Sequence, residues 1–377
     1  MASDRPRAVR VERALDVAAL VIDAFADSGY DDADQPALSF GPDKAIAETA
    51  MLVYAVHFSQ FSGTLREKVV ALRDRVASAA RSERLLTQVA MRPALAEGLL
   101  VPHVLMTALG NPDPDVDALL AACVAAPGGR GRELPPFGVL EKLWIREVAG
   151  RPRADDEWPR VLAASVLSTT VDVLGGLRED LYAFTHSVMY ATDFGRRGRA
   201  LPRGPAAILA DARSMLAVCL DAGDYDLTGE ILLTWPYLGQ PRCPAAEFAQ
   251  QVLEAAEDRA GLLPGGTTSR ERLGSLVGVE RRRYALATAY HTAYVMGLAC
   301  AAPSPASERG TTPANPWAAG EGEDLDTMLA DAAGLESFRR DVAIASAVRN
   351  GNYRSLARLL DREADPSERT PLEVQAA

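Results

Sequence analysis

Apolar residues recur at every third or fourth position along most of the chain, and strictly alternating runs are rare. The first such stretch covers residues 11–27, and its predicted apolar face contains Val11, Leu15, Ala18 and Ile22. Similar stretches follow three residues that commonly cap helix N-termini, namely Asp43, Thr64 and Ser82. Because a period near 3.6 residues is that of an amphipathic helix, the sequence predicts an all-α protein.

Short segments rich in glycine and proline separate the predicted helices. In residues 110–124, GNPDPDVDALLAACV, a glycine stop, a proline turn and a new helix start follow one another, as in an antiparallel helical hairpin. Residues 216–233 and 346–360 repeat this order, with Gly223 and Gly351 as predicted left-handed helix ends. Stacked antiparallel hairpins indicate an α/α toroid or an α-solenoid-like array, although two copies are also compatible with chance likeness between amphipathic hairpins.

The same breaks divide the chain into predicted segments. Residues 1–301 are expected to form the main helical domain, with a candidate subdomain break near 127–138. Residues 302–324 are rich in Pro, Gly, Ala and Ser, so they cannot bury enough apolar surface to offset backbone entropy and are predicted to be a flexible linker. A C-terminal helical hairpin at 325–366 and a tail at 367–377 complete the predicted organisation.

Composition and charge narrow the functional classes. The formal net charge of −11 argues against a general affinity for nucleic acid or for anionic membranes. No apolar run of membrane-spanning length occurs, and no secretory signal precedes the first predicted helix. The four cysteines stand far apart without a CxxC pair and are expected to be reduced thiols. We therefore expect a cytoplasmic protein whose partner is a small molecule or another protein, of unknown oligomeric state.

Candidate chemistry begins in residues 181–195, LYAFTHSVMYATDFG, which read as an amphipathic helix. If this helix is continuous, His186 and Asp193 share one face about 10 Å apart along the axis, a spacing that suits two walls of one pocket. The alternative role for Asp193 is a local ion pair with a downstream cation, and the candidates are Arg196, Arg197 and Arg199.

Two further segments place polar side chains within apolar sequence. In residues 290–300, YHTAYVMGLAC, His291 falls on the inward face, where it is either a site residue or a core histidine with a local partner. In residues 224–238, Glu230 follows Asp226 by one helical turn and is surrounded by leucine and isoleucine. An inward carboxylate needs a cation or histidine partner, whereas an outward one is an ordinary solvated residue.

Pooling these segments defines a candidate site between helices. The candidate catalytic residues are His186, Asp193, Glu230 and His291. The candidate ligand-binding residues are Thr185, Tyr190, Tyr290 and Tyr294. Two imidazoles and two carboxylates suit acid–base catalysis or a divalent metal such as Zn, Fe or Mn. Since the chain contains no HExxH motif, no EF-hand loop and no paired ExxH motif, a metal stays an open alternative and no cofactor is identified.

The segments THSVMYATDFG, DLTGEILLTWPYL and YHTAYVMGLAC together resemble a family of uncharacterised all-helical proteins from actinobacteria, a domain of unknown function often found near natural-product gene clusters. The resemblance covers about residues 10–300. It implies a helical cytoplasmic protein with a role as a biosynthetic accessory enzyme, and it supplies no family-level catalytic residues.

Two functional hypotheses follow. The first is a small-molecule enzyme or binding protein with a polar pocket between helices. The second is a helical-repeat scaffold for protein–protein interaction that carries no chemistry. In the first case the candidate side chains converge in one cavity, whereas in the second they are dispersed and an exposed apolar groove lies elsewhere.

Overall fold

The computed structural model describes residues 4–26, 41–59, 61–126, 133–151, 156–173 and 175–302, and all regular structure within these ranges is helical. The predicted all-α class is therefore confirmed. The short 3-10 helices are η2 (Pro93–Leu95) and η4 (Val166–Ser168). The α-helices are α1 (Asp4–Ala26), α2 (Pro42–His57), α3 (Thr64–Ala80), α4 (Glu83–Met91), α5 (Ala96–Leu99), α6 (Val101–Ala108), α7 (Pro114–Ala125), α8 (Pro136–Val148), α9 (Glu157–Ala163), α10 (Arg178–Thr192), α11 (Pro205–Ala222), α12 (Tyr225–Leu232), α13 (Thr234–Tyr237), α14 (Pro244–Ala260), α15 (Arg270–Ser275) and α16 (Gly278–Ala301).

The helix stop, turn and helix start predicted at residues 110–124 are present, but α7 packs against α4 and α5 rather than against α6, so the predicted antiparallel hairpin is not formed. Gly110 has a φ of 85°, which only a residue without a Cβ adopts freely, and it follows the end of α6. The side chain of Asp113 then accepts hydrogen bonds from the backbone N–H groups of Asp115 and Val116, and Pro114 occupies the first turn of α7. Stop, turn and start thus follow the order read from the sequence.

Two predicted helix caps lie inside their helices. The N-cap of α2 is Gly41 rather than Asp43, because Pro42 has the backbone angle of a first helical residue and begins the helix earlier. The N-cap of α3 is Gly63, whose φ of 63° favours glycine, and Thr64 is the first helical residue. Ser82, from which a further helix was predicted to start, is the N-cap of α4.

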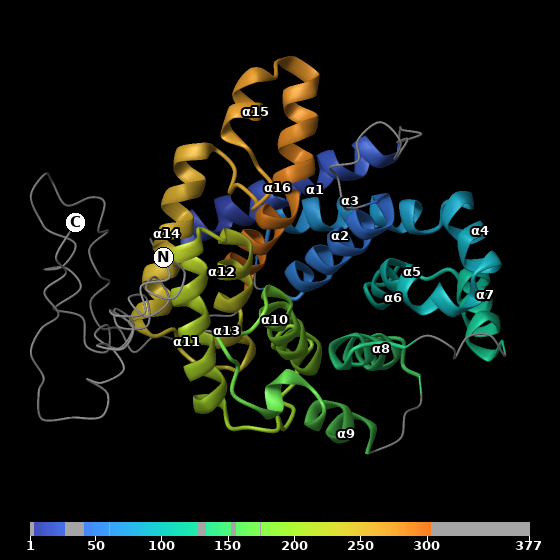
Figure 1. The fold of residues 1–377 in the computed structure, drawn as a ribbon. Helices are drawn as coiled ribbons and strands as arrows, with labels where there is room; N and C mark the ends of the chain where they lie inside the picture. Colours follow the sequence, from blue (N-terminus) through green and yellow to red (C-terminus); the bar gives the residue numbers. More distant parts are fainter. Residues whose placement is uncertain are drawn as a thin grey trace, which may run out of the picture.

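The first and last described helices pack along each other. α1 makes its most extensive contact with α16, and α16 also packs against α2 and α12. α12 in turn contacts α10, which lies near the centre of the molecule between α8 and α12 (Figure 1). Four helices that are distant in sequence, α2, α10, α12 and α16, therefore surround one region of the interior.

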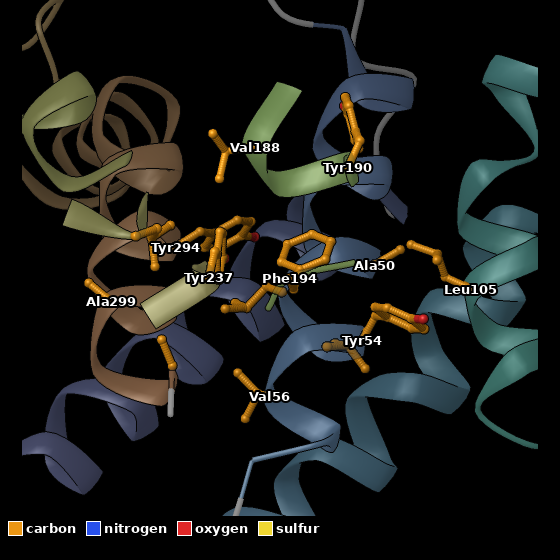
Figure 2. Packing of buried hydrophobic residues seen from close by; sticks show 14 of the residues in the cluster. Ala50, Tyr54, Val56, Leu105, Val188, Tyr190, Phe194, Tyr237, Tyr294 and Ala299 are labelled. Atoms are coloured by element: carbon orange, nitrogen blue, oxygen red, sulfur yellow. The ribbon is translucent and has the colours of Figure 1, made fainter. Parts of the chain in front are cut away.

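Aromatic side chains fill the interior next to this region (Figure 2). Phe194, just after α10, lies between Tyr54 of α2 and Tyr237 of α13, with ring centroids 6.1 and 5.9 Å away. All three side chains are buried. Edge-to-face packing of such rings stabilises a fixed arrangement beyond the area they bury, so this core is a rigid support for the neighbouring polar groups.

Glycines allow α16 to approach two other helices closely. A Cβ built on Gly229 of α12 would lie 2.4 Å from Cγ1 of Val295, and one built on Gly297 of α16 would lie 2.4 Å from Cβ of Ala14 in α1. Both distances are shorter than non-bonded carbon atoms tolerate. The absence of a side chain at position 229 therefore sets the distance between α12 and α16.

One half of the predicted internal repeat lies in the described residues. Gly223 ends α11 in the left-handed conformation, as the sequence predicted, and α12 begins at Tyr225. Gly351, the linker after residue 302, the 325–366 hairpin and the tail lie outside the described residues, as do residues 127–132 of the candidate break. The division into domains and the toroid or solenoid arrangement stay predictions.

The sequence predicted reduced cysteines and no membrane-spanning segment. All four cysteines lie in the described residues and are free thiols, and three of them are buried. Within the described ranges, we find no helix that combines the length and apolarity required to cross a bilayer.

Candidate functional site

A cluster of carboxylates and histidines lies where α2, α10, α12 and α16 meet. Each helix contributes a polar side chain from a face that is otherwise buried, and we call these residues the histidine–carboxylate cluster: Glu48, His186, Asp226, Glu230 and His291. Three of the four candidate catalytic residues belong to it, namely His186, Glu230 and His291.

His291 lies at the centre of the cluster. Its Nε2 atom is 3.2 Å from Oε1 of Glu230 and 3.3 Å from Oδ1 of Asp226. Its Nδ1 atom is 3.1 Å from Oε2 of Glu48 on α2. One imidazole ring is thus surrounded by three carboxylates from two other helices.

Glu230 joins α12 to α10 as well as to α16. Its second oxygen, Oε2, accepts a 2.6 Å hydrogen bond from the hydroxyl of Thr185 and lies 3.7 Å from Nδ1 of His186. The same His186 nitrogen lies 3.0 Å from the carbonyl oxygen of Tyr182, one turn earlier in α10. This backbone contact fixes the orientation of the His186 ring beside the cluster.

Asp226 lies one turn before Glu230 and uses its two oxygens differently. Oδ2 accepts a 2.8 Å hydrogen bond from the hydroxyl of Tyr182, and Arg178 approaches the same oxygen at 3.5 Å. Oδ1 is buried and accepts no hydrogen bond, and it points to Nε2 of His291. Only 8% of the Asp226 residue is exposed, so an unsatisfied oxygen here is energetically costly.

The mutual electrostatics of the cluster set its protonation. Burial disfavours a charged imidazole, but Glu48 and Asp226 outweigh burial and raise the pKa of His291 well above 6.5. Burial likewise favours a neutral Glu48, yet His291 and Lys44 lower the pKa of its carboxyl to about 2. Burial and the neighbouring Glu230 raise the pKa of Asp226. His186 and His291 lower the pKa of Glu230 against the effect of burial.

A cavity of about 70 Å³ opens beside the cluster. Its polar wall contains Glu48, Thr185, His186, Glu230 and His291, and its apolar wall contains Met51, Met189, Phe194, Leu233, Tyr237, Val295 and Leu298. A larger cavity of about 660 Å³ among the described residues shares Phe194, Tyr237 and Leu298 with it. The volume of the larger cavity falls in the range of small-molecule sites.

Asp193 does not join this cluster. α10 ends at Thr192, and Asp193 and Phe194 both have left-handed backbone angles, with φ of 50° and 56°. The helical stripe from His186 therefore stops before Asp193. The side chain instead accepts hydrogen bonds from Nε1 of Trp144 at 2.8 Å and from the Tyr54 hydroxyl at 3.1 Å.

The second oxygen of Asp193 makes the local ion pairs considered as the alternative. Oδ2 lies 3.2 Å from Arg196 and 3.2 Å from Arg197. Arg199, the third candidate cation, pairs with Glu147 instead. Asp193 thus closes the end of α10 and ties it to α2 and α8, and the prediction that it shares a pocket with His186 is wrong.

Some of the candidate ligand-binding residues lie at the cluster and its cavity, whereas Tyr190 does not. Thr185 and Tyr294 line the small cavity, and the Tyr294 hydroxyl also lies 2.8 Å from Oγ1 of Thr49. The buried Tyr290 lies next to Glu48, and burial with that carboxylate raises the pKa of its hydroxyl. Tyr190 is turned towards α8, where it donates a 3.1 Å hydrogen bond to Glu141.

Sequence reasoning missed Glu48 entirely and did not include Asp226 in the candidate site. Glu48 follows Ala45 by three residues and precedes Leu52 by four, so it lies on the buried stripe of α2. Asp226 precedes Glu230 by four residues on a helix whose residues 226–232 are all buried. An acid at an apolar stripe position was the available signal in both cases.

The comparison with known families is consistent with the sequence resemblance. A family model described as a domain of unknown function, DUF6895, matches residues 11–301, well over half of the chain. The chain belongs to this family. The match contains all five residues of the histidine–carboxylate cluster. No curated protein and no solved structure matches the chain.

Proposed function

We propose that the protein binds a small molecule in the cavity beside the histidine–carboxylate cluster and acts on it chemically. The observation that carries this proposal is the convergence of His186, Glu230 and His291 on one cavity wall. Burying several ionisable groups together costs folding free energy, and clusters of this kind are concentrated at the functional sites of proteins.

Each of the two cavities holds a different part of the ligand. The larger cavity accommodates the body of the ligand, and the small one receives its polar end against the cluster. Phe194, Tyr237 and Leu298 line both cavities, so a ligand that occupies both would contact these residues.

The alternative is a stacked-hairpin or toroidal scaffold for protein–protein interaction. The large exposed apolar side chains of the described residues are distributed over elements that do not all adjoin, for example Leu20 on α1, Met91 on α4 and Leu177 before α10. The favoured proposal is therefore the pocket. A cytoplasmic location and a role in natural-product biosynthesis are retained with it as predictions.

A bulky substitution at the shared wall tests the proposal. Leu298→Trp fills the junction of the two cavities without altering the polar cluster, whereas Leu286→Trp places the same side chain on α16 about 18 Å away. The full-length proteins are incubated with a small-molecule extract of the source cells, and retained compounds are identified by native mass spectrometry.

We expect the wild type and Leu286→Trp to retain the same compound and Leu298→Trp to lose it. Circular dichroism checks that each variant is folded. Retention by Leu298→Trp at the wild-type level, or retention of no compound by the wild type, would overturn the proposed function.

A further inference from the structure

Three atoms of the histidine–carboxylate cluster face one point. They are Oδ1 of Asp226, Oε1 of Glu230 and Nε2 of His291, and they lie within 4.8 Å of one another. The nitrogen is 3.3 and 3.2 Å from the two oxygens. Neighbouring ligands at about 2.1 Å from a metal ion are about 3.0 to 3.4 Å apart, so the two nitrogen–oxygen separations match those of neighbouring ligands in a coordination sphere.

The remaining polar atom of each group is directed to a different partner. Oδ2 of Asp226 accepts from Tyr182, and Oε2 of Glu230 accepts from Thr185. Nδ1 of His291 faces Glu48 at 3.1 Å. A carboxylate on the far nitrogen of a histidine is the usual outer partner of a metal ligand, because it fixes the tautomer that leaves the near nitrogen free to coordinate.

An unsatisfied atom marks the same point. Oδ1 of Asp226 is buried without a hydrogen bond, and it is directed at the position that the three atoms share. Glu48, Asp226 and Glu230 together bring three carboxylates against one central imidazole. A cation bound among them would coordinate Oδ1 of Asp226, which accepts no hydrogen bond.

From these observations we infer that Asp226, Glu230 and His291 bind one divalent first-row transition metal ion, with Glu48 as the outer partner of His291. One nitrogen and two carboxylate oxygens suit Mn²⁺, Fe²⁺ or Zn²⁺, and the set contains no thiolate for softer ions. Metal binding displaces the proton on Nε2 of His291. Three protein ligands leave positions open for water or a ligand atom.

His186 is not required as a ligand. Its Nδ1 atom lies 3.0 Å from the Tyr182 carbonyl oxygen and 3.3 Å from Oγ1 of Thr185, so this nitrogen is already engaged. The His186 side chain lies on the cavity wall beside the proposed metal position, where it would contact a ligand bound to the ion. The inference deepens the proposed function and rests on the same cluster.

Metal titration of the full-length protein tests the inference. After dialysis against EDTA and removal of the chelator, Mn²⁺, Fe²⁺ under anaerobic conditions, and Zn²⁺ are titrated separately by isothermal calorimetry. We expect one equivalent of at least one of these ions to bind. Asp226→Asn, which preserves size, should weaken binding at least 100-fold, and Glu48→Gln should weaken it about 10- to 100-fold.

The matched control is His103→Gln. His103 is also a buried histidine paired with a carboxylate, Asp117 at 2.9 Å, but it lies in α6 outside the cluster. Its substitution should leave stoichiometry and affinity unchanged. No saturable binding by the wild type, or wild-type affinity in the folded Asp226→Asn variant, would overturn the inference.

The two proposals fail separately. A wild type that binds no metal but loses its small molecule on Leu298→Trp refutes the metal inference and leaves the pocket in place. A protein that binds metal as described, but whose small-molecule retention is unaffected by Leu298→Trp, refutes the proposed function alone.

Discussion

Replacing Glu48 by Gln should destabilise the metal-free protein in a pH-dependent way. The pKa of the Glu48 carboxyl falls from 4.5 to about 2 in the folded protein, which corresponds to about 3 kcal/mol in favour of its charged form. The side chain is 15% exposed and Gln retains some hydrogen bonding, so we expect the free energy of unfolding to fall by about 2 kcal/mol at pH 6.

The sign of the pH dependence follows from the two pKa shifts. The lowered pKa of Glu48 stabilises the fold above pH 4.5, and this contribution is lost as pH falls towards 2. The raised pKa of His291 stabilises the fold fully below pH 6.5, and this contribution is lost as pH rises through the folded-state pKa. The pair therefore contributes most between pH 4.5 and 6.5.

Urea denaturation in EDTA at pH 6 and at successively higher pH values measures the effect. The difference between wild type and Glu48→Gln should shrink as the pH rises through the folded-state pKa of His291, because the imidazole then loses its charge. Glu257→Gln is the control, since Glu257 is also shielded from water, with 2% of its side chain exposed, but pairs with Arg10 and Arg13, which stay charged. The reasoning is refuted if the Glu48→Gln difference is below about 0.5 kcal/mol at pH 6, or if it stays constant over the whole range of higher pH in which the protein folds.

Two further predictions separate the cluster from its surroundings. Asp193→Asn keeps a residue that tolerates the left-handed backbone but loses the ion pairs to Arg196 and Arg197. Urea denaturation should therefore show that the free energy of unfolding falls by about 2 kcal/mol, with metal affinity unchanged. Weakened metal binding would instead place Asp193 in the site. Gly229→Ala should force α12 away from α16 and weaken metal binding at least tenfold in calorimetry. Gly297→Ala, which introduces the same 2.4 Å clash but against α1, should lower the melting temperature without changing metal affinity. Equal metal affinities in the two variants would count against this account.

The sequence was informative wherever helical periodicity extended over a whole element. It placed His186, Glu230 and His291 on inward faces, and the structure brings these three together. It failed at Asp193, because the periodicity was extrapolated one residue beyond the end of α10. A left-handed turn at an aspartate followed by phenylalanine has no strong local signal, since glycine is the residue usually expected there.

Which helices become neighbours could not be predicted from periodicity. An apolar stripe shows that a helix is buried, but it does not identify the helix against which it packs. The partnership of Glu48 with His291 depends on α2 packing against α16, and that contact follows from the whole set of interhelical contacts. For the same reason, Gly229 was not recognised as the residue that sets the distance between α12 and α16.

The packing of α1 and α2 against α16 has a consequence for synthesis of the protein. Thr49 and Tyr294 touch across 245 positions of the chain. During translation, the apolar faces of α1 and α2 stay without their packing partner until α16 has left the ribosome. Exposed apolar surface of this kind favours aggregation or chaperone binding. Glu48 cannot meet His291 until then, so any metal-binding capacity would arise late, when nearly the whole domain has been made.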